Sequence, residues 1–100
     1  IRLIGGGSKS TLWRQIAAGL MNLPIRVPLL DEAAALGGAV QALWCLKNTT
    51  GKCDIAELCA EHIKLDESKS TNPIPANVAA YDKAYAEYTK MVDTVAPLYK

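Results

Sequence analysis

The sequence lacks phenylalanine, contains a single histidine, and has almost no excess of charge of either sign. Its 11 basic and 10 acidic residues give a net charge of +1, and the basic residues are scattered along the chain. Proteins that bind nucleic acids usually gather lysine and arginine on one face. The charge pattern therefore argues against a nucleic-acid partner.

Long apolar runs are also absent, although 50% of the residues are hydrophobic. A helix that spans a bilayer needs roughly 18 or more consecutive apolar residues, and no stretch of this sequence reaches that length. We therefore expect no membrane partner.

Cysteine is scarce, and its pattern predicts neither disulfides nor a metal site. The three cysteines, Cys45, Cys53 and Cys59, are an odd number without a framework spacing, which suits reduced thiols in the cytoplasm. A zinc site usually has paired short spacings such as C-x₂-C. Cys59 and His62 lack that pairing, so we expect buried thiols and no metal ligands in this chain.

The hydrophobic pattern predicts strand–helix–strand–helix followed by a helical tail. The expected strands are residues 1–4 and 25–27, and the expected helices are about 11–21, 32–46, 55–62 and 76–95, with 63–71 compatible with one more strand. Ser8 or Ser10, Asp31 and Asp54 are the expected N-caps of the first three helices. This is an α/β half-domain. Two strands are too few to form a parallel sheet that is buried on both faces. We therefore expect further strands upstream, in a longer parent chain.

Two features of the expected helices indicate close packing. Apolar residues at four-residue spacing predict a buried stripe on the first helix, consisting of Leu12, Ile16 and Leu20 with Trp13 and Ala17 alongside. The second helix carries Gly37 and Gly38, and each glycine costs about 1 kcal/mol relative to alanine. The pair therefore predicts close approach by another backbone. In the last helix Tyr81, Tyr85 and Tyr88 are expected to pack rather than to stack on a ligand.

Three consecutive glycines, Gly5–Gly7, follow the first expected strand and precede the first helix. Such a turn exposes backbone N–H groups where a phosphate or nucleotide can approach, although a purely structural turn has the same composition. A Walker A loop is excluded, because Ser8 stands where G-x-x-x-x-G-K-[ST] needs glycine before Lys9. The dinucleotide fingerprint G-x-G-x-x-G is matched incompletely, with Ser10 in place of its last glycine.

The segments IRLIGGGSKSTLWRQIAAGLMNLPIRVP and EAAALGGAVQALW together resemble the C-terminal domain of the FGGY carbohydrate kinases, and within that family the xylulokinase branch. The run Gly-Gly-Gly-x-x-Ser-x-x-Trp-Arg-Gln resembles the adenosine motif of the family. The resemblance is closest over residues 1–46 and looser in the last helix. It implies an adenosine-motif α/β unit at 1–46 and a mainly helical tail at 47–100, within an actin-like, ribonuclease-H-like kinase domain.

The resemblance also implies a function, transfer of the γ-phosphate of Mg-ATP to a hydroxyl of D-xylulose or a related ketose or polyol. Gly6 and Gly7 would lie against the ribose and α-phosphate, Ser10 near the adenine or ribose, and Gly5 would shape the turn. Arg14 and Gln15 are expected to anchor loop backbone. The catalytic aspartate, the sugar-binding residues and most metal contacts of the family lie upstream of this motif. The chain would therefore supply one wall of the ATP site and no catalytic residue.

Two other functions stay open at this stage. One is a free-standing actin-like module that binds a nucleotide or a protein, and the other is a fragment of a dinucleotide-binding dehydrogenase. Related kinases are often dimers, so a homodimer is a further expectation.

Overall fold

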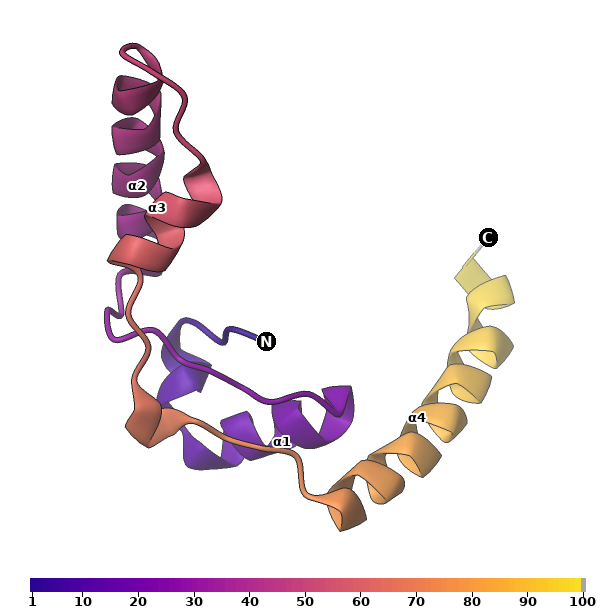
Figure 1. Cartoon of the computed structure of the whole chain (residues 1–100). Helices are drawn as coiled ribbons and strands as arrows, with labels where there is room; N and C mark the ends of the chain where they lie inside the picture. The colour runs from indigo at the N-terminus through magenta and orange to yellow at the C-terminus, as the bar shows by residue number, and fades with distance from the viewer. Residues whose placement is uncertain (100) are drawn as a thin grey trace.

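A computed structural model describes residues 1–99 as a chain of helices and extended segments (Figure 1). The α-helices are α1 (Thr11–Met21), α2 (Ala33–Asn48), α3 (Ile55–His62) and α4 (Pro75–Val95), and the short 3-10 helices are η1 (Gly6–Lys9), η2 (Glu67–Lys69) and η3 (Ala96–Tyr99). The prediction of an α/β half-domain is wrong for this chain, because residues 1–99 form no β-strand.

The segments expected to be strands are extended but pair only through isolated β-bridges. Arg2 pairs with Arg26 in parallel, while Ile25 and Pro28 pair with Thr71 and Leu65 in antiparallel fashion. A ladder requires successive pairs, and prolines at both ends of segment 25–27 remove N–H donors from it. The expected strand at 63–71 contributes two of these bridges and is otherwise occupied by η2.

The small core lies where the central extended segment meets α1. Ile25 and Val27 are 0% and 3% exposed, and they form one cluster with Ala18 of α1. Arg26, between them, uses its backbone on the opposite edge, where its N–H donates to the Ile1 carbonyl at 2.8 Å. Successive residues of an extended chain alternate in direction. The segment around Arg26 therefore pairs with the first segment on one edge and with the segment around Thr71 on the other.

The N-caps are partly as predicted. The Ser10 hydroxyl accepts a hydrogen bond from the Trp13 N–H at 3.3 Å, and the Asp54 carboxylate accepts one from the Ala56 N–H at 2.9 Å. Both residues therefore begin their helices as expected. The prediction for Asp31 is wrong, because α2 begins after Glu32 without a side-chain cap.

The buried face of α1 is not the predicted apolar stripe. Leu12 and Trp13 are 69% and 61% exposed, whereas the buried positions of the helix are Arg14, Ala18 and Gly19. The face that turns inward is thus the one lined by small residues and one arginine. Within residues 1–99, most of the surface of these two larger apolar side chains stays uncovered.

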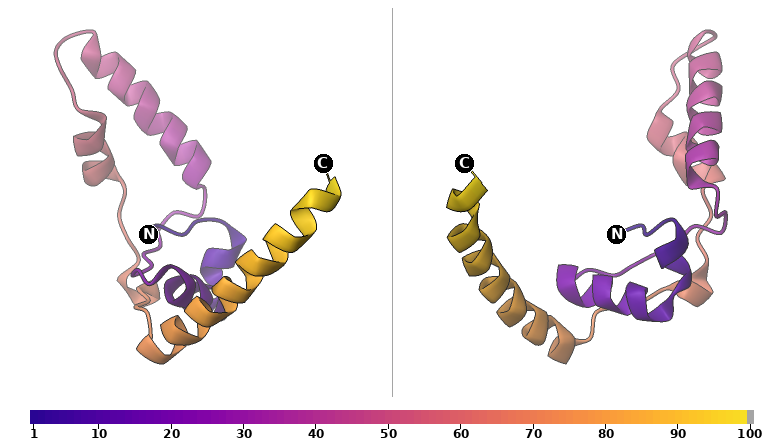
Figure 2. Two further views of the ribbon diagram at one scale, coloured as in Figure 1. Left: turned by 90° about the vertical axis from the view of Figure 1, so that its right-hand side faces the viewer. Right: turned by 180° about the vertical axis from the view of Figure 1, so that it is seen from behind.

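The other helices form two arms that leave this centre at opposite ends (Figures 1 and 2). α2 and α3 pack together in one arm, where the Trp44 indole N–H donates to the Cys53 carbonyl at 2.8 Å. The other arm is α4, whose N-terminal half packs on α1. The predicted close approach at the glycine pair of α2 is not found, since no heavy atom lies within 4 Å of a Cβ built at Gly37 or Gly38.

The described chain exposes far more surface than a domain of its size. Its accessible area is 7362 Å², whereas a folded protein of this mass exposes about 5,500 Å². Its radius of gyration is 18.7 Å, against about 13 Å for a compact domain of 100 residues. On α4, the half-buried Tyr81 packs on α1 as predicted. Tyr85 and Tyr88 stack on each other, with ring centroids 6.3 Å apart, but each stays 60% exposed. No helix of the described part combines the length and apolarity of a bilayer span.

Candidate functional site

The glycine loop bends sharply where the first extended segment ends. Gly5 has φ +80° and ψ −171°, a conformation that residues with a Cβ rarely adopt. The chain then forms one 3-10 turn, η1, in which the Ser8 N–H donates to the Gly5 carbonyl at 3.1 Å. The Ser8 hydroxyl donates to the same carbonyl at 2.7 Å. Gly5 therefore sets the direction of the loop, and Ser8 holds it closed.

The outer side of the loop is open. A Cβ built at Gly5, Gly6 or Gly7 would find no heavy atom within 4 Å. Within residues 1–99, the N–H groups of Gly6 and Gly7 donate to no acceptor. Unpaired backbone donors beside open space suit an anionic or polar ligand, since no side chain keeps the ligand from the backbone.

Ser10 stands at the junction of the loop and α1. Its N–H donates to the Gly7 carbonyl at 3.2 Å, while its hydroxyl oxygen accepts from the Trp13 N–H. The hydroxyl keeps its own proton to donate. The four predicted site residues, Gly5, Gly6, Gly7 and Ser10, thus belong to one continuous turn that leads into a capped helix.

Arg14 supports the loop from behind. It is 7% exposed, and its Nη1 donates to the Ser8 carbonyl at 2.7 Å. The same guanidinium donates to Thr11 Oγ1 at 3.2 Å and to Thr71 Oγ1 at 3.4 Å. The prediction that Arg14 anchors loop backbone is confirmed. Gln15, its neighbour, anchors backbone as well, but that of Asn72 in the tail, at 3.1 Å.

Lys9 forms an exposed ion pair with Asp31, with the ammonium 2.9 Å from the carboxylate oxygen. The hydrogen bond and charge of Lys9 lower the pKa of the Asp31 carboxyl, and the same two effects of Asp31 raise the pKa of Lys9. The pair connects the loop to the segment before α2. Lys9 therefore has a protein partner.

Sequence reasoning missed the two residues that complete this support, Ser8 and Thr71. Ser8 is not the helix cap that the sequence allows, because it is buried and bonds Gly5 instead. Thr71 lies 57 residues from Arg14 in sequence. No pattern in the sequence pairs the tail with the loop.

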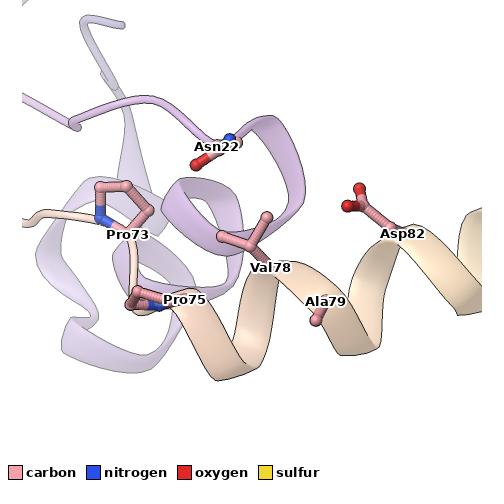
Figure 3. Close-up of a pocket in the computed structure, with 6 residues that line it drawn as sticks. All are labelled: Asn22, Pro73, Pro75, Val78, Ala79 and Asp82. Carbon is pink, nitrogen blue, oxygen red and sulfur yellow. The ribbon is translucent and has the colours of Figure 1, made fainter.

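Other places in the chain are weaker candidates. Figure 3 shows a hollow of about 270 Å³ between the end of α1 and the start of α4, lined by Asn22, Pro73, Pro75, Val78, Ala79 and Asp82. It has one carboxylate and no basic residue, so it does not suit a phosphate. The cysteines are free, and residues 1–99 contain no cluster of three or more potential metal ligands. The glycine loop is therefore the candidate site, with no Mg²⁺ ligand set of its own.

The chain is similar to known carbohydrate kinases. The FGGY family of carbohydrate kinases, C-terminal domain, matches residues 1–46, which contain the whole glycine loop. A xylulose kinase of Haemophilus influenzae is 44% identical over 88 residues, which are 88% of this chain and 17% of that protein. A ribulokinase of Bacillus licheniformis is 31% identical over 87 residues, 87% of this chain and 16% of that protein.

Solved structures contain the same arrangement of elements. The crystal structure of a ligand-bound xylulose kinase from Lactobacillus acidophilus superposes with a TM-score of 0.79 at 25% identity, covering 96% of this chain and 18% of that one. The chain belongs to the FGGY family of carbohydrate kinases. It spans about a sixth of the length of the curated relatives it matches.

Proposed function

We propose that this chain is the C-terminal, nucleotide-binding part of an ATP-dependent sugar kinase. The observation that carries the proposal is the open glycine loop, with two unpaired N–H groups and a buried arginine behind it. The loop lies inside the region that matches the family. A nucleotide is the ligand that such a loop suits best, because it offers a phosphate to backbone donors and a ribose and a flat base to the open glycine surface.

In this proposal Gly6 and Gly7 lie against the ribose and α-phosphate of ATP. The absence of any atom within 4 Å of their Cβ positions supports this placement. Ser10 lies near the adenine or ribose, where its hydroxyl can donate a hydrogen bond. Gly5 touches no ligand, and its role is the turn that its positive φ creates.

The chain does not catalyse the reaction by itself. Phosphoryl transfer needs a positioned nucleotide, a metal ion and a base for the accepting hydroxyl. Residues 1–99 contain no cluster of three or more potential metal ligands. In our proposal the metal, the base and the sugar contacts come from the larger part of the kinase, for which the relatives have the length.

The exposed apolar side chains support the same conclusion. Leu12, Trp13, Tyr85 and Tyr88 are each at least 60% exposed, and isolated domains rarely leave so much large apolar surface open. In the complete kinase these faces would be covered by the rest of the C-terminal domain. Free cysteines support a reducing compartment, so we propose the cytoplasm as its location.

The proposed substrate is D-xylulose, because the relative that is 44% identical is a xylulose kinase. The ribulokinase similarity makes related ketoses the alternatives to test. The full-length protein should be incubated with Mg-ATP and each of D-xylulose, D-ribulose, glycerol or no sugar, and ADP release followed. We expect release that depends on D-xylulose. ADP release that no sugar stimulates would contradict the proposed function.

A further inference from the structure

We infer that Arg14 is a positioning residue for the nucleotide, acting through the glycine loop rather than by touching the ligand. This inference rests on the proposed function, because it assumes that the loop binds ATP. It adds that nucleotide affinity depends on a side chain from α1 and on a tail segment that lies outside the region matched by the family.

The hydrogen bonds of Arg14 connect three parts of the chain. Its shortest bond, 2.7 Å, fixes the Ser8 carbonyl in η1, and this bond is buried. Ser8 in turn bonds Gly5 through both its N–H and its hydroxyl. A movement of the guanidinium would therefore move the loop directly. The bond from Nε to Thr71 Oγ1, at 3.4 Å, fixes the guanidinium from the tail side.

The position of Thr71 is itself determined by the core. Its N–H and carbonyl exchange hydrogen bonds with Ile25 at 3.0 and 2.8 Å, and Ile25 is fully buried. The bridge at the centre of the fold therefore fixes the Thr71 backbone. The Thr71 hydroxyl donates to the Lys69 carbonyl at 3.1 Å, which orients its oxygen to accept from Arg14. The planar fork of arginine suits this role, because it presents several donors in a fixed geometry, which lysine lacks.

The charge of Arg14 is unusual for a residue so buried. None of the ion pairs found in residues 1–99 includes Arg14, whose partners are a carbonyl and two hydroxyl groups. Buried charges are normally paired with an opposite charge. A positive charge held behind the loop favours an anion in front of it, which is where the open glycine surface lies. The arrangement thus favours the nucleotide by geometry and by charge.

If Arg14 had a structural role alone, it would only hold the tail against α1. Gln15 already holds the tail in this way, because its side chain donates to the Asn72 carbonyl. Gln15 makes no bond to the loop, so Gln15→Ala is the matched control. The experiment uses the full-length kinase and the variants Arg14→Met, Arg14→Lys and Gln15→Ala. Calorimetry gives the Kd for ADP, steady-state kinetics give KM for ATP and for sugar, and thermal unfolding gives Tm.

We expect Arg14→Met to raise the Kd for ADP and the KM for ATP about tenfold, as hydrogen bonds from charged groups imply, with the KM for sugar changed less than about twofold. Arg14→Lys keeps the charge but loses the fork, and should raise the Kd about threefold. Gln15→Ala should lower Tm and leave the Kd within about twofold of the parent.

An unchanged Kd in Arg14→Met, or an increase equal to that in Gln15→Ala, would overturn the inference. If Arg14→Met does not fold, Arg14→Lys decides the matter, and a Kd equal to that of the parent overturns it. ADP binding is measured without sugar. A protein that binds ADP but phosphorylates no sugar would therefore contradict the proposed function and still test Arg14. A parent protein that binds no ADP would overturn both.

Discussion

Gly19 of α1 faces the ring of Tyr81 of α4, and a Cβ built on Gly19 would lie 2.9 Å from two carbons of that ring. Atoms of this kind do not approach so closely in folded proteins, so the glycine is what lets the helices meet. The contact joins the helix that follows the glycine loop to the long tail helix. The contact therefore helps to place α4 relative to the glycine loop.

Gly19→Ala should therefore destabilise the full-length protein. Alanine in a helix is favoured over glycine by about 1 kcal/mol, but overpacking costs about 1–3 kcal/mol, so we expect a net loss of about 1 kcal/mol in denaturant unfolding. In a Tyr81→Ala background the ring is gone, and the same substitution should be neutral or stabilising. An equal loss in both backgrounds would contradict the packing described here.

Gly5→Ala should destabilise the protein through backbone strain alone. Gly5 has φ +80°, and no heavy atom lies near its Cβ position, so the cost comes from the conformation and not from a clash. Such strain costs about 1–3 kcal/mol. Gly6→Ala is the matched control, since its position is equally open and its φ is ordinary. Unfolding experiments that show equal losses for both variants would contradict this account of the turn.

The Lys9–Asp31 pair predicts a dependence of stability on pH. The lowered pKa of Asp31 means that its carboxylate stabilises the folded state above about pH 4, and that this contribution disappears as the pH falls through the lowered pKa. The raised pKa of Lys9 makes its contribution present below about pH 10 and lost above.

Asp31→Asn should therefore lower Tm slightly at pH 7 and leave it unchanged near pH 2. Because both side chains are exposed, 1 M salt should also remove the difference at pH 7. A Tm difference that is the same at pH 2 and pH 7 would show that Asp31 acts through something other than its charge.

The 100-residue chain expressed alone should lack a cooperative thermal transition. Its buried hydrophobic residues are few (Ala18, Ile25, Val27, Val40 and Leu58), and a core of this size supplies little stability. We expect it to bind the dye ANS, which reports exposed apolar surface. The same residues within the full-length kinase should unfold cooperatively without dye binding. A cooperative transition in the isolated chain would contradict the proposal that its apolar faces are covered by the rest of the kinase.

Local signals in the sequence predicted the helices well. Ser10 and Asp54 are small polar residues directly before apolar periodic segments, and each caps its helix through its side chain. The glycine loop and its position before α1 were also evident. These features depend on contacts within three residues, which a single sequence contains in full.

The strands and the buried face of α1 could not be predicted, because they depend on distant partners. The segment around Ile25 has strand-like residues, but a ladder needs neighbours on both edges, and residues 1–99 supply only single bridges. Trp13 is 61% exposed, because little of the described chain packs on it. The bond between Arg14 and Thr71 spans 57 residues, and no sequence period relates the two.

The most direct test of the central claim, that the glycine loop is the nucleotide wall of a kinase, is calorimetry of ADP binding to full-length Gly6→Val. Valine would fill the open space where the ribose and α-phosphate are proposed to lie, and no heavy atom of residues 1–99 lies within 4 Å of a Cβ built at Gly6. We predict that Gly6→Val loses ADP binding, by at least about a hundredfold in Kd, as expected when a ligand is sterically excluded, while Tm stays close to that of the parent. Unchanged ADP affinity in the folded variant would contradict the claim.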